Sequence, residues 1–125
     1  MKFLVVGLGS MGKRRIRNLL VNNEKDLVGF DIRQDRNKEV QVKYGIKIVD
    51  NFNDLSSEDF DGLIISTSPE AHGNYIRFAL KHRKHFFVEH PTSDDGYEDI
   101  FRNKELPVVQ APSSTFLHYL PIKIM

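Results

Sequence analysis

The sequence contains no cysteine, which excludes a disulfide framework, a thiolate nucleophile and a cysteine metal site. An excess of charge of one sign is also missing, because 18 basic and 17 acidic residues leave a net charge of +1. A chain so close to neutral lacks the electrostatic footprint of a nucleic-acid-binding protein. No apolar run is long enough for a membrane span or for the core of a signal peptide. We therefore expect a cytoplasmic protein without nucleic-acid or membrane partners.

Two kinds of catalytic centre are missing from the pattern as well. The histidines and carboxylates show no metal-ligand spacing on a common face, so we expect no metal site. No serine stands at a nucleophile elbow with a histidine and an aspartate to serve it. What remains is a chain of 125 residues, 40% hydrophobic and 28% charged, which is enough for one globular domain with its own core.

Short apolar runs alternate with helical patterns, which is typical of a parallel sheet covered by helices on both faces. The sequence predicts strands at 3–6, 27–31, 46–49, 63–65, 85–88 and 107–110. Helices are expected at 11–21, 35–44, 70–83 and 94–104, with a turn of helix within 51–59 and another helix from 116. Two successive βαβ halves predict a doubly wound α/β sheet of the Rossmann type, with strand order 3-2-1-4-5-6.

A glycine fingerprint follows the first apolar run directly. Gly7, Gly9 and Gly12 form the G-x-G-x-x-G pattern, with Ser10 and Met11 between the last two glycines. Gly7 allows a tight turn, Gly9 lets the backbone approach a pyrophosphate, and Gly12 lets the helix pack closely on the strand. The amides of the helix N-terminus then face the phosphates. The alternative is a glycine-rich turn that binds nothing.

Asp31 ends the second apolar run, about twenty residues after the glycines, where dinucleotide-binding folds carry an acid. Its carboxylate can accept hydrogen bonds from both ribose hydroxyls of NAD, and its charge repels a 2′-phosphate. Arg33 and Arg36 lie close by in the sequence and can soften that repulsion. The pattern therefore predicts NAD as the cofactor and leaves NADP open, with Arg33 as a further candidate contact.

Four basic residues crowd the start of the first predicted helix. Arg14, one turn from the glycines, is a candidate partner for a cofactor phosphate. Lys13, Arg15 and Arg17 are expected on a solvated face. A nucleic-acid patch is disfavoured because the chain is nearly neutral and no aromatic residues are interleaved.

Polar clusters follow two later strands and are expected to face the same crevice as the glycines. The strand at 63–65 is followed by Ser66, Thr67, Ser68 and Pro69, and the strand at 85–88 by Glu89 and His90. Ser68 can cap the helix that follows, and Pro69 suits the first helical position. Thr67 and Ser68 lie where a nicotinamide ribose is bound in such folds, although helix capping alone explains them equally well.

Three stretches together resemble the Gfo/Idh/MocA oxidoreductases, a family that includes glucose–fructose oxidoreductase and inositol dehydrogenase. The first is 7–14 with Asp31 behind it; the second is 67–72, similar to the family motif T-x-P-x-x-H; the third is 84–91, similar to G-K-H-V-x-x-E-K-P. Their order and spacing match over about ninety residues. The resemblance adds His72 and Glu89 to the candidate cofactor-binding residues.

The resemblance implies hydride transfer between a nicotinamide cofactor and a sugar, cyclitol or related polyol, with Glu89 and His90 as catalytic candidates. His90 stands where the family carries a lysine that relays the substrate's hydroxyl proton. Family members continue into a second domain that binds much of the substrate and supplies a catalytic histidine. By analogy, residues 1–112 form the cofactor domain and 113–125 begin the substrate domain. A homo-oligomer is compatible with the family.

The other class that the sequence leaves open is a non-catalytic NAD-binding module or regulatory protein. Without a substrate domain, nothing in the chain excludes water or orients a hydroxyl. The histidine at position 90 also fits altered or lost chemistry. On the enzyme hypothesis, these 125 residues alone are expected to be inactive.

Overall fold

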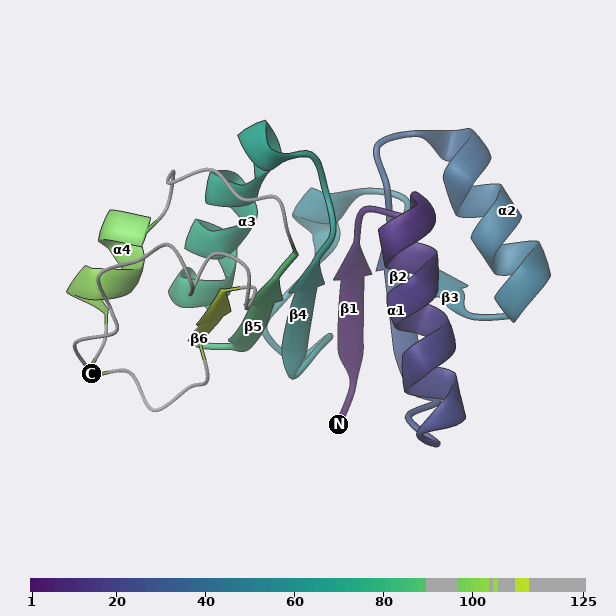
Figure 1. Cartoon of the computed structure of the whole chain (residues 1–125), viewed down its shortest axis with the longest axis horizontal. Coiled ribbons are helices and arrows are strands. Elements are labelled where there is room, and N and C mark those ends of the chain that lie inside the picture. Colours follow the sequence, from purple (N-terminus) through teal and green to yellow (C-terminus); the bar gives the residue numbers. More distant parts are fainter. Residues whose placement is uncertain (90–96, 104, 106–109, 113–125) are drawn as a thin grey trace.

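The structure is a computed structural model that describes residues 1–89, 97–103, 105 and 110–112. Its centre is a parallel sheet in the order β3-β2-β1-β4-β5-β6, as predicted, with the strands side by side in Figure 1. The strands are β1 (Phe3–Val6), β2 (Leu27–Phe30), β3 (Lys47–Ile48), β4 (Gly62–Ile65), β5 (His85–Val88) and β6 (Gln110–Pro112). The predicted last strand shares only Gln110 with β6, since residues 107–109 lie outside the described part and β6 continues to Pro112.

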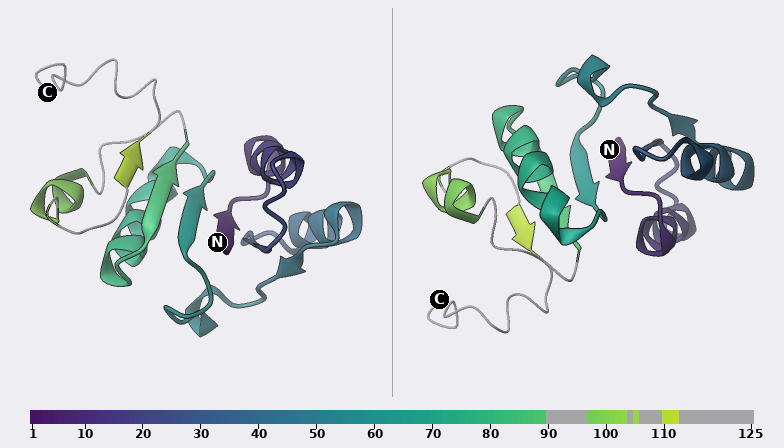
Figure 2. Two further views of the ribbon diagram at one scale, coloured as in Figure 1. Left: turned by 90° about the horizontal axis from the view of Figure 1, so that it is seen from below. Right: turned by 90° about the horizontal axis from the view of Figure 1, so that it is seen from above.

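Helices cover both faces of the sheet. They are α1 (Ser10–Val21), α2 (Gln34–Tyr44), α3 (Pro69–Lys81) and α4 (Tyr97–Arg102), with a short 3₁₀ turn η1 (Phe52–Asp54). Seen along the sheet in Figure 2, α1 and α2 lie on one face, and α3 and η1 lie on the other. Within the described residues, no helix has the length and apolar character needed to cross a membrane. The helix predicted from residue 116 lies outside the described residues.

Local sequence signals mark the helix ends. Gly45 ends α2 in the left-handed conformation, at φ 66°, and its amide donates to the Gln41 carbonyl. Ser68 is the N-cap of α3 and Pro69 occupies the first turn, as predicted, although no capping bond from the Ser68 side chain is formed. The helix stops at Lys81, two residues before the predicted end, because Arg83 adopts a positive φ of 57° and the chain turns into β5.

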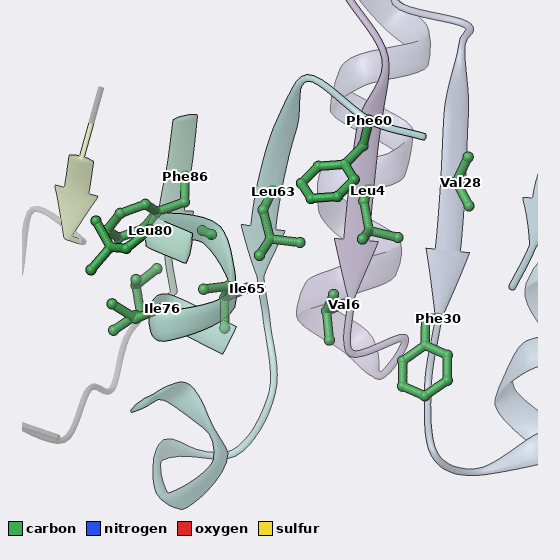
Figure 3. Close-up of a cluster of buried hydrophobic side chains, with 12 residues drawn as sticks. Leu4, Val6, Val28, Phe30, Phe60, Leu63, Ile65, Ile76, Leu80 and Phe86 are labelled. Carbon is green, nitrogen blue, oxygen red and sulfur yellow. The ribbon is translucent and has the colours of Figure 1, made fainter. Parts of the chain in front are cut away.

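The alternation of side chains in the strands divides the core into two layers. Toward α3, Leu4 and Val6 meet Ile76, Leu80 and other buried residues, shown in Figure 3. Toward α1 and α2, the buried residues are Val5, Leu8, Ile16, Leu27, Val40 and Ile46. Because β1 is buried on both faces, its sequence is a continuous apolar run, and the glycine turn follows directly from its buried end.

Candidate functional site

Four residues form a single row at the carboxyl edge of the sheet, and each is the first residue after one of four neighbouring strands. The paired ends of β2, β1, β4 and β5 are in register, so the row consists of Asp31, Gly7, Ser66 and Glu89. The amides of the last three each donate to the final carbonyl of a neighbouring strand at 2.8 Å. Residues predicted from separate motifs are thus brought together by strand register alone.

A cavity of about 430 Å³ opens along this row. Most of the predicted cofactor residues line it, namely Gly7, Gly9, Ser10, Met11, Asp31, Ser66, Thr67, Ser68, Pro69 and Glu89. It also takes in Arg36, which the sequence placed near Asp31, and residues that the sequence did not single out for this place: Val6, Ile32, Ala71 and Tyr75. The cavity therefore runs across the point where the strand order reverses, which is where open α/β sheets bind ligands.

Four other predicted residues are not among those that line the cavity. Gly12 packs beneath it, Arg14 is exposed, Arg33 points to Asp35, and His72 is buried behind the β4–α3 turn. His90 lies outside the described residues. In the described part of the chain, no group of three histidines and carboxylates is arranged to hold a metal ion.

The three fingerprint glycines are required for different reasons. At Gly7, φ is 92°, and a Cβ would lie 2.6 Å from the Ser66 carbonyl carbon. At Gly12, a Cβ would collide with the carbonyl oxygen of Gly7. At Gly9, by contrast, a Cβ would meet only the Arg36 guanidinium at 3.6 Å, an ordinary contact, and φ is −76°. The fold thus needs glycine at 7 and 12, whereas at 9 the open space fits a ligand lying against the backbone.

The Asp31 carboxylate is buried, and both of its oxygens already have partners. Oδ2 accepts from the Leu8 amide and Oδ1 from the Arg33 amide, each at 2.8 Å. The Asp31 backbone is held by Asn37, whose side chain bonds both its amide and its carbonyl. These bonds leave further lone pairs on the carboxylate toward the cavity. Sequence reasoning found this residue but not its bond to the glycine loop.

The two nearby arginines differ in their surroundings. Arg36 lines the cavity, lies 3.6 Å from the Cβ position of Gly9 and reaches Oδ2 of Asp31 at 3.5 Å. Arg33 extends outward and forms a two-point ion pair with Asp35 at 2.7 and 3.1 Å. Of the two, Arg36 is therefore placed to meet a ligand beside Asp31.

The prediction that Arg15 lies on a solvated face of α1 is wrong. Its guanidinium donates to both carboxylate oxygens of Glu89, at 2.6 and 2.7 Å, and lies over the ring of Phe87. The bond to Glu89 raises the pKa of Arg15. Lys13 and Arg17 remain near the surface, where they pair with Glu39 and Tyr44 of α2. Periodicity could not reveal the Arg15 contact, because its partner is 74 residues away.

His72 is buried in the first turns of α3, with only 1% of its surface exposed. Its Nε2 lies 2.8 Å from the Thr67 carbonyl oxygen, so the imidazole braces the turn that carries the 66–69 cluster. Burial lowers the pKa of His72, which keeps the ring neutral at physiological pH. The Nδ1 of this ring and the Oγ of Ser66 are buried without a partner in the described structure.

This combination defines a dinucleotide-binding Rossmann domain. A strand, a tight glycine turn and the N-terminus of α1 form an anion-binding edge, and a buried acid follows the neighbouring strand. The space over Gly9 and the acceptors of Asp31 fit the pyrophosphate and ribose of NAD or NADP.

The chain belongs to the GFO_IDH_MocA family, described as an oxidoreductase family with an NAD-binding Rossmann fold, whose model matches residues 1–118. It is 28% identical over 96 residues to the myo-inositol 2-dehydrogenase of Thermotoga maritima, covering 74% of this chain and 29% of that enzyme. The match thus covers the NAD-binding Rossmann fold of the family, and the chain spans under a third of this relative's length.

Solved structures show the same fold. A probable dehydrogenase from Thermotoga maritima superposes with a TM-score of 0.78 at 26% identity, covering 90% of this chain and 36% of that one. The WlbA dehydrogenase from Bordetella pertussis, solved with NADH and UDP-GlcNAcA, gives a TM-score of 0.76 at 18% identity, covering 90% and 36%. The latter likeness supports the fold alone.

Proposed function

We propose that this chain is the cofactor-binding part of an enzyme that transfers hydride between NAD and a sugar, cyclitol or related polyol. The observation that carries the proposal is the cavity in which the glycine turn, Asp31 and the end of β4 meet. The inositol dehydrogenase relative supports the substrate class. Residues 1–112 would form the cofactor domain, and the sequence from 113 would lead into a substrate domain.

Different residues along the cavity would bind different parts of the cofactor. Asp31 would accept the hydroxyls of the adenosine ribose, and the amides at the start of α1 would face the pyrophosphate. The turn from Ser66 to Pro69 would line the nicotinamide ribose. When bound, the cofactor supplies the hydride acceptor or donor, and the protein supplies orientation. Substrate binding and exclusion of water would come from the second domain, so these 125 residues alone would be inactive.

Calorimetric titration with NAD⁺, NADH and NADP⁺ tests the proposal. We expect binding of the first two, with a lower affinity for NADP⁺ because its 2′-phosphate faces the buried Asp31 carboxylate. Arg36→Ala should weaken the remaining affinity for NADP⁺ by about tenfold, the typical effect of a hydrogen bond between charged groups. Arg33→Ala is the matched comparison and should have little effect on the affinity for NADP⁺. Failure of all three nucleotides to bind would refute the proposal.

A non-catalytic NAD-binding module is the second candidate, favoured by His90 in place of the family's lysine. Turnover assays of the whole protein with a panel of polyols and NAD⁺ separate the two, because the module would bind NAD⁺ without oxidising any of them. A cytoplasmic location and self-association remain predictions.

A further inference from the structure

Arg15 of α1 holds the carboxylate of Glu89, the residue that follows β5. Nε donates to Oε2 at 2.6 Å and Nη2 donates to Oε1 at 2.7 Å. The Glu89 side chain is 5% exposed, and that of Arg15 is 31% exposed. A two-point pair of this kind fixes the orientation of the carboxylate as well as its position.

Both members of the pair are held by further contacts. The Glu89 amide donates to the Ile65 carbonyl at 2.8 Å, which ties its backbone to β4. The Arg15 guanidinium lies 5.2 Å from the centre of the Phe87 ring, and Phe87 precedes Glu89 by two residues in the same segment. Glu89 therefore lines the cavity with its carboxylate held in place, and Arg15, which is not among the lining residues, holds it from α1.

Glu89 lines the end of the cavity opposite Asp31. Asp31 follows β2 and Glu89 follows β5, with β1 and β4 between them. If Asp31 binds the adenosine ribose, as proposed above, the extended cofactor places its nicotinamide toward Glu89. The nicotinamide ring carries a positive charge in NAD⁺ and none in NADH. A bare carboxylate at this end would therefore favour the oxidised cofactor.

We propose that Arg15 is a positioning residue that fixes Glu89 and cancels its charge, so that the site binds NAD⁺ and NADH without an electrostatic bias toward either. This inference rests on the proposed function. Neither residue can have this role alone. Arg15 without Glu89, or Glu89 without Arg15, would leave an uncompensated charge beside the nicotinamide.

His72, from α3, does not replace Arg15 as a partner for Glu89. Its Nε2 lies 2.8 Å from the Thr67 carbonyl oxygen, and burial lowers the pKa of the imidazole, which disfavours its charged form. Among the described residues, Arg15 is thus the cation that compensates Glu89. Without it, the buried Glu89 carboxylate would lose its two guanidinium hydrogen bonds and stand uncompensated beside the cofactor.

The test is the ratio of the dissociation constant for NAD⁺ to that for NADH, measured at neutral pH. Arg15→Met, which keeps an apolar stem over Phe87, should lower the ratio about tenfold, because the Glu89 carboxylate is left uncompensated. Glu89→Gln should raise the ratio, because it leaves Arg15 uncompensated.

Arg17→Met is the matched control, because Arg17 lies on the same helix and bonds Tyr44 instead. The double variant Arg15→Met/Glu89→Gln contains no buried lone charge and should regain the original ratio. Should the single Arg15 variant fail to fold, Glu89→Gln and the double variant still decide the matter. An unchanged ratio in Glu89→Gln, or a double variant that keeps the shifted ratio of Glu89→Gln, would overturn this inference alone. Loss of all nucleotide binding by the unaltered chain would overturn the proposed function and this inference with it.

Discussion

The backbone amide of Leu8 donates to Oδ2 of Asp31 at 2.8 Å, across 23 residues of sequence. This bond ties the glycine turn after β1 to the acid after β2. Because Asp31 is 5% exposed, the bond lies in a part of the structure that water does not readily compete for. Asp31 is thus a structural acceptor for the loop as well as a candidate ribose ligand.

Replacement of Asp31 by alanine should therefore have two separable effects. The Leu8 and Arg33 amides lose their acceptor, which should lower the free energy of unfolding by about 1–3 kcal/mol. The affinity for NAD⁺ should fall by a similar amount as the ribose loses its partner. Urea unfolding and calorimetry measure the two effects. Asp35→Ala, which removes an exposed carboxylate paired with Arg33, is the control and should change neither quantity by much. A stable Asp31→Ala variant would contradict the structural role of the carboxylate.

The three glycines should respond differently to the same substitution. Gly7→Ala and Gly12→Ala should each lower the free energy of unfolding by about 1–3 kcal/mol, because the new Cβ meets backbone atoms at Ser66 and Gly7. Gly9→Val should fold with nearly the stability of the unaltered chain, since only the flexible Arg36 side chain faces its Cβ. It should nevertheless lose nucleotide binding, because the branched side chain fills the space of the pyrophosphate.

Denaturant unfolding and NADH fluorescence on the three glycine variants check this difference. If Gly9→Val binds NADH with the original affinity while folded, the glycine turn is not the phosphate site. If it unfolds, the space above Gly9 is needed by the protein itself.

The sequence predicts the strand order and most of the cavity because both depend on short-range signals. The run from Phe3 to Val6 is long enough for a strand, and the glycines follow it immediately. Strand register then brings the polar residues after β1, β2, β4 and β5 together without further information. In the same way, Gly45 and Pro69 mark helix ends through their own backbone preferences.

The same signals do not predict contacts between side chains that are far apart in the sequence. Arg15 looks like one member of a basic cluster, and only the packing of α1 over the sheet brings it to Glu89. Arg33 is the nearer of the two arginines to Asp31 in the sequence, yet Arg36 in the first turn of α2 lines the cavity, whereas Arg33 at the N-cap pairs with Asp35. The burial of His72 depends on the β4–α3 turn closing over it.

His72 should make stability depend on pH. Burial lowers the pKa of His72 in the folded chain, so below about pH 6.5 the unfolded chain binds more protons than the folded one. The free energy of unfolding should therefore fall as the pH is lowered through this range. His72→Gln should reduce that slope, whereas His82, whose pKa is also lowered, still contributes to it. Urea unfolding between pH 5 and pH 8 gives the slopes; equal slopes for the two proteins would exclude His72 as a source.

His90 is expected to relay the substrate's hydroxyl proton in the whole protein, because it follows Glu89, whose amide and carboxylate are both fixed at the cavity. His90→Ala should lower kcat roughly 100-fold, the usual effect of removing a general acid–base group. The affinity for NAD⁺ should stay nearly constant, since the proposed ribose and phosphate contacts follow β1, β2 and β4 rather than involving His90. The pH–rate profile should also lose a limb near the ordinary histidine pKa of about 6.5. His85→Ala, at the opposite end of β5, should leave the rate and profile unchanged. If His90→Ala does the same, the proton passes through a residue outside this chain's cofactor site.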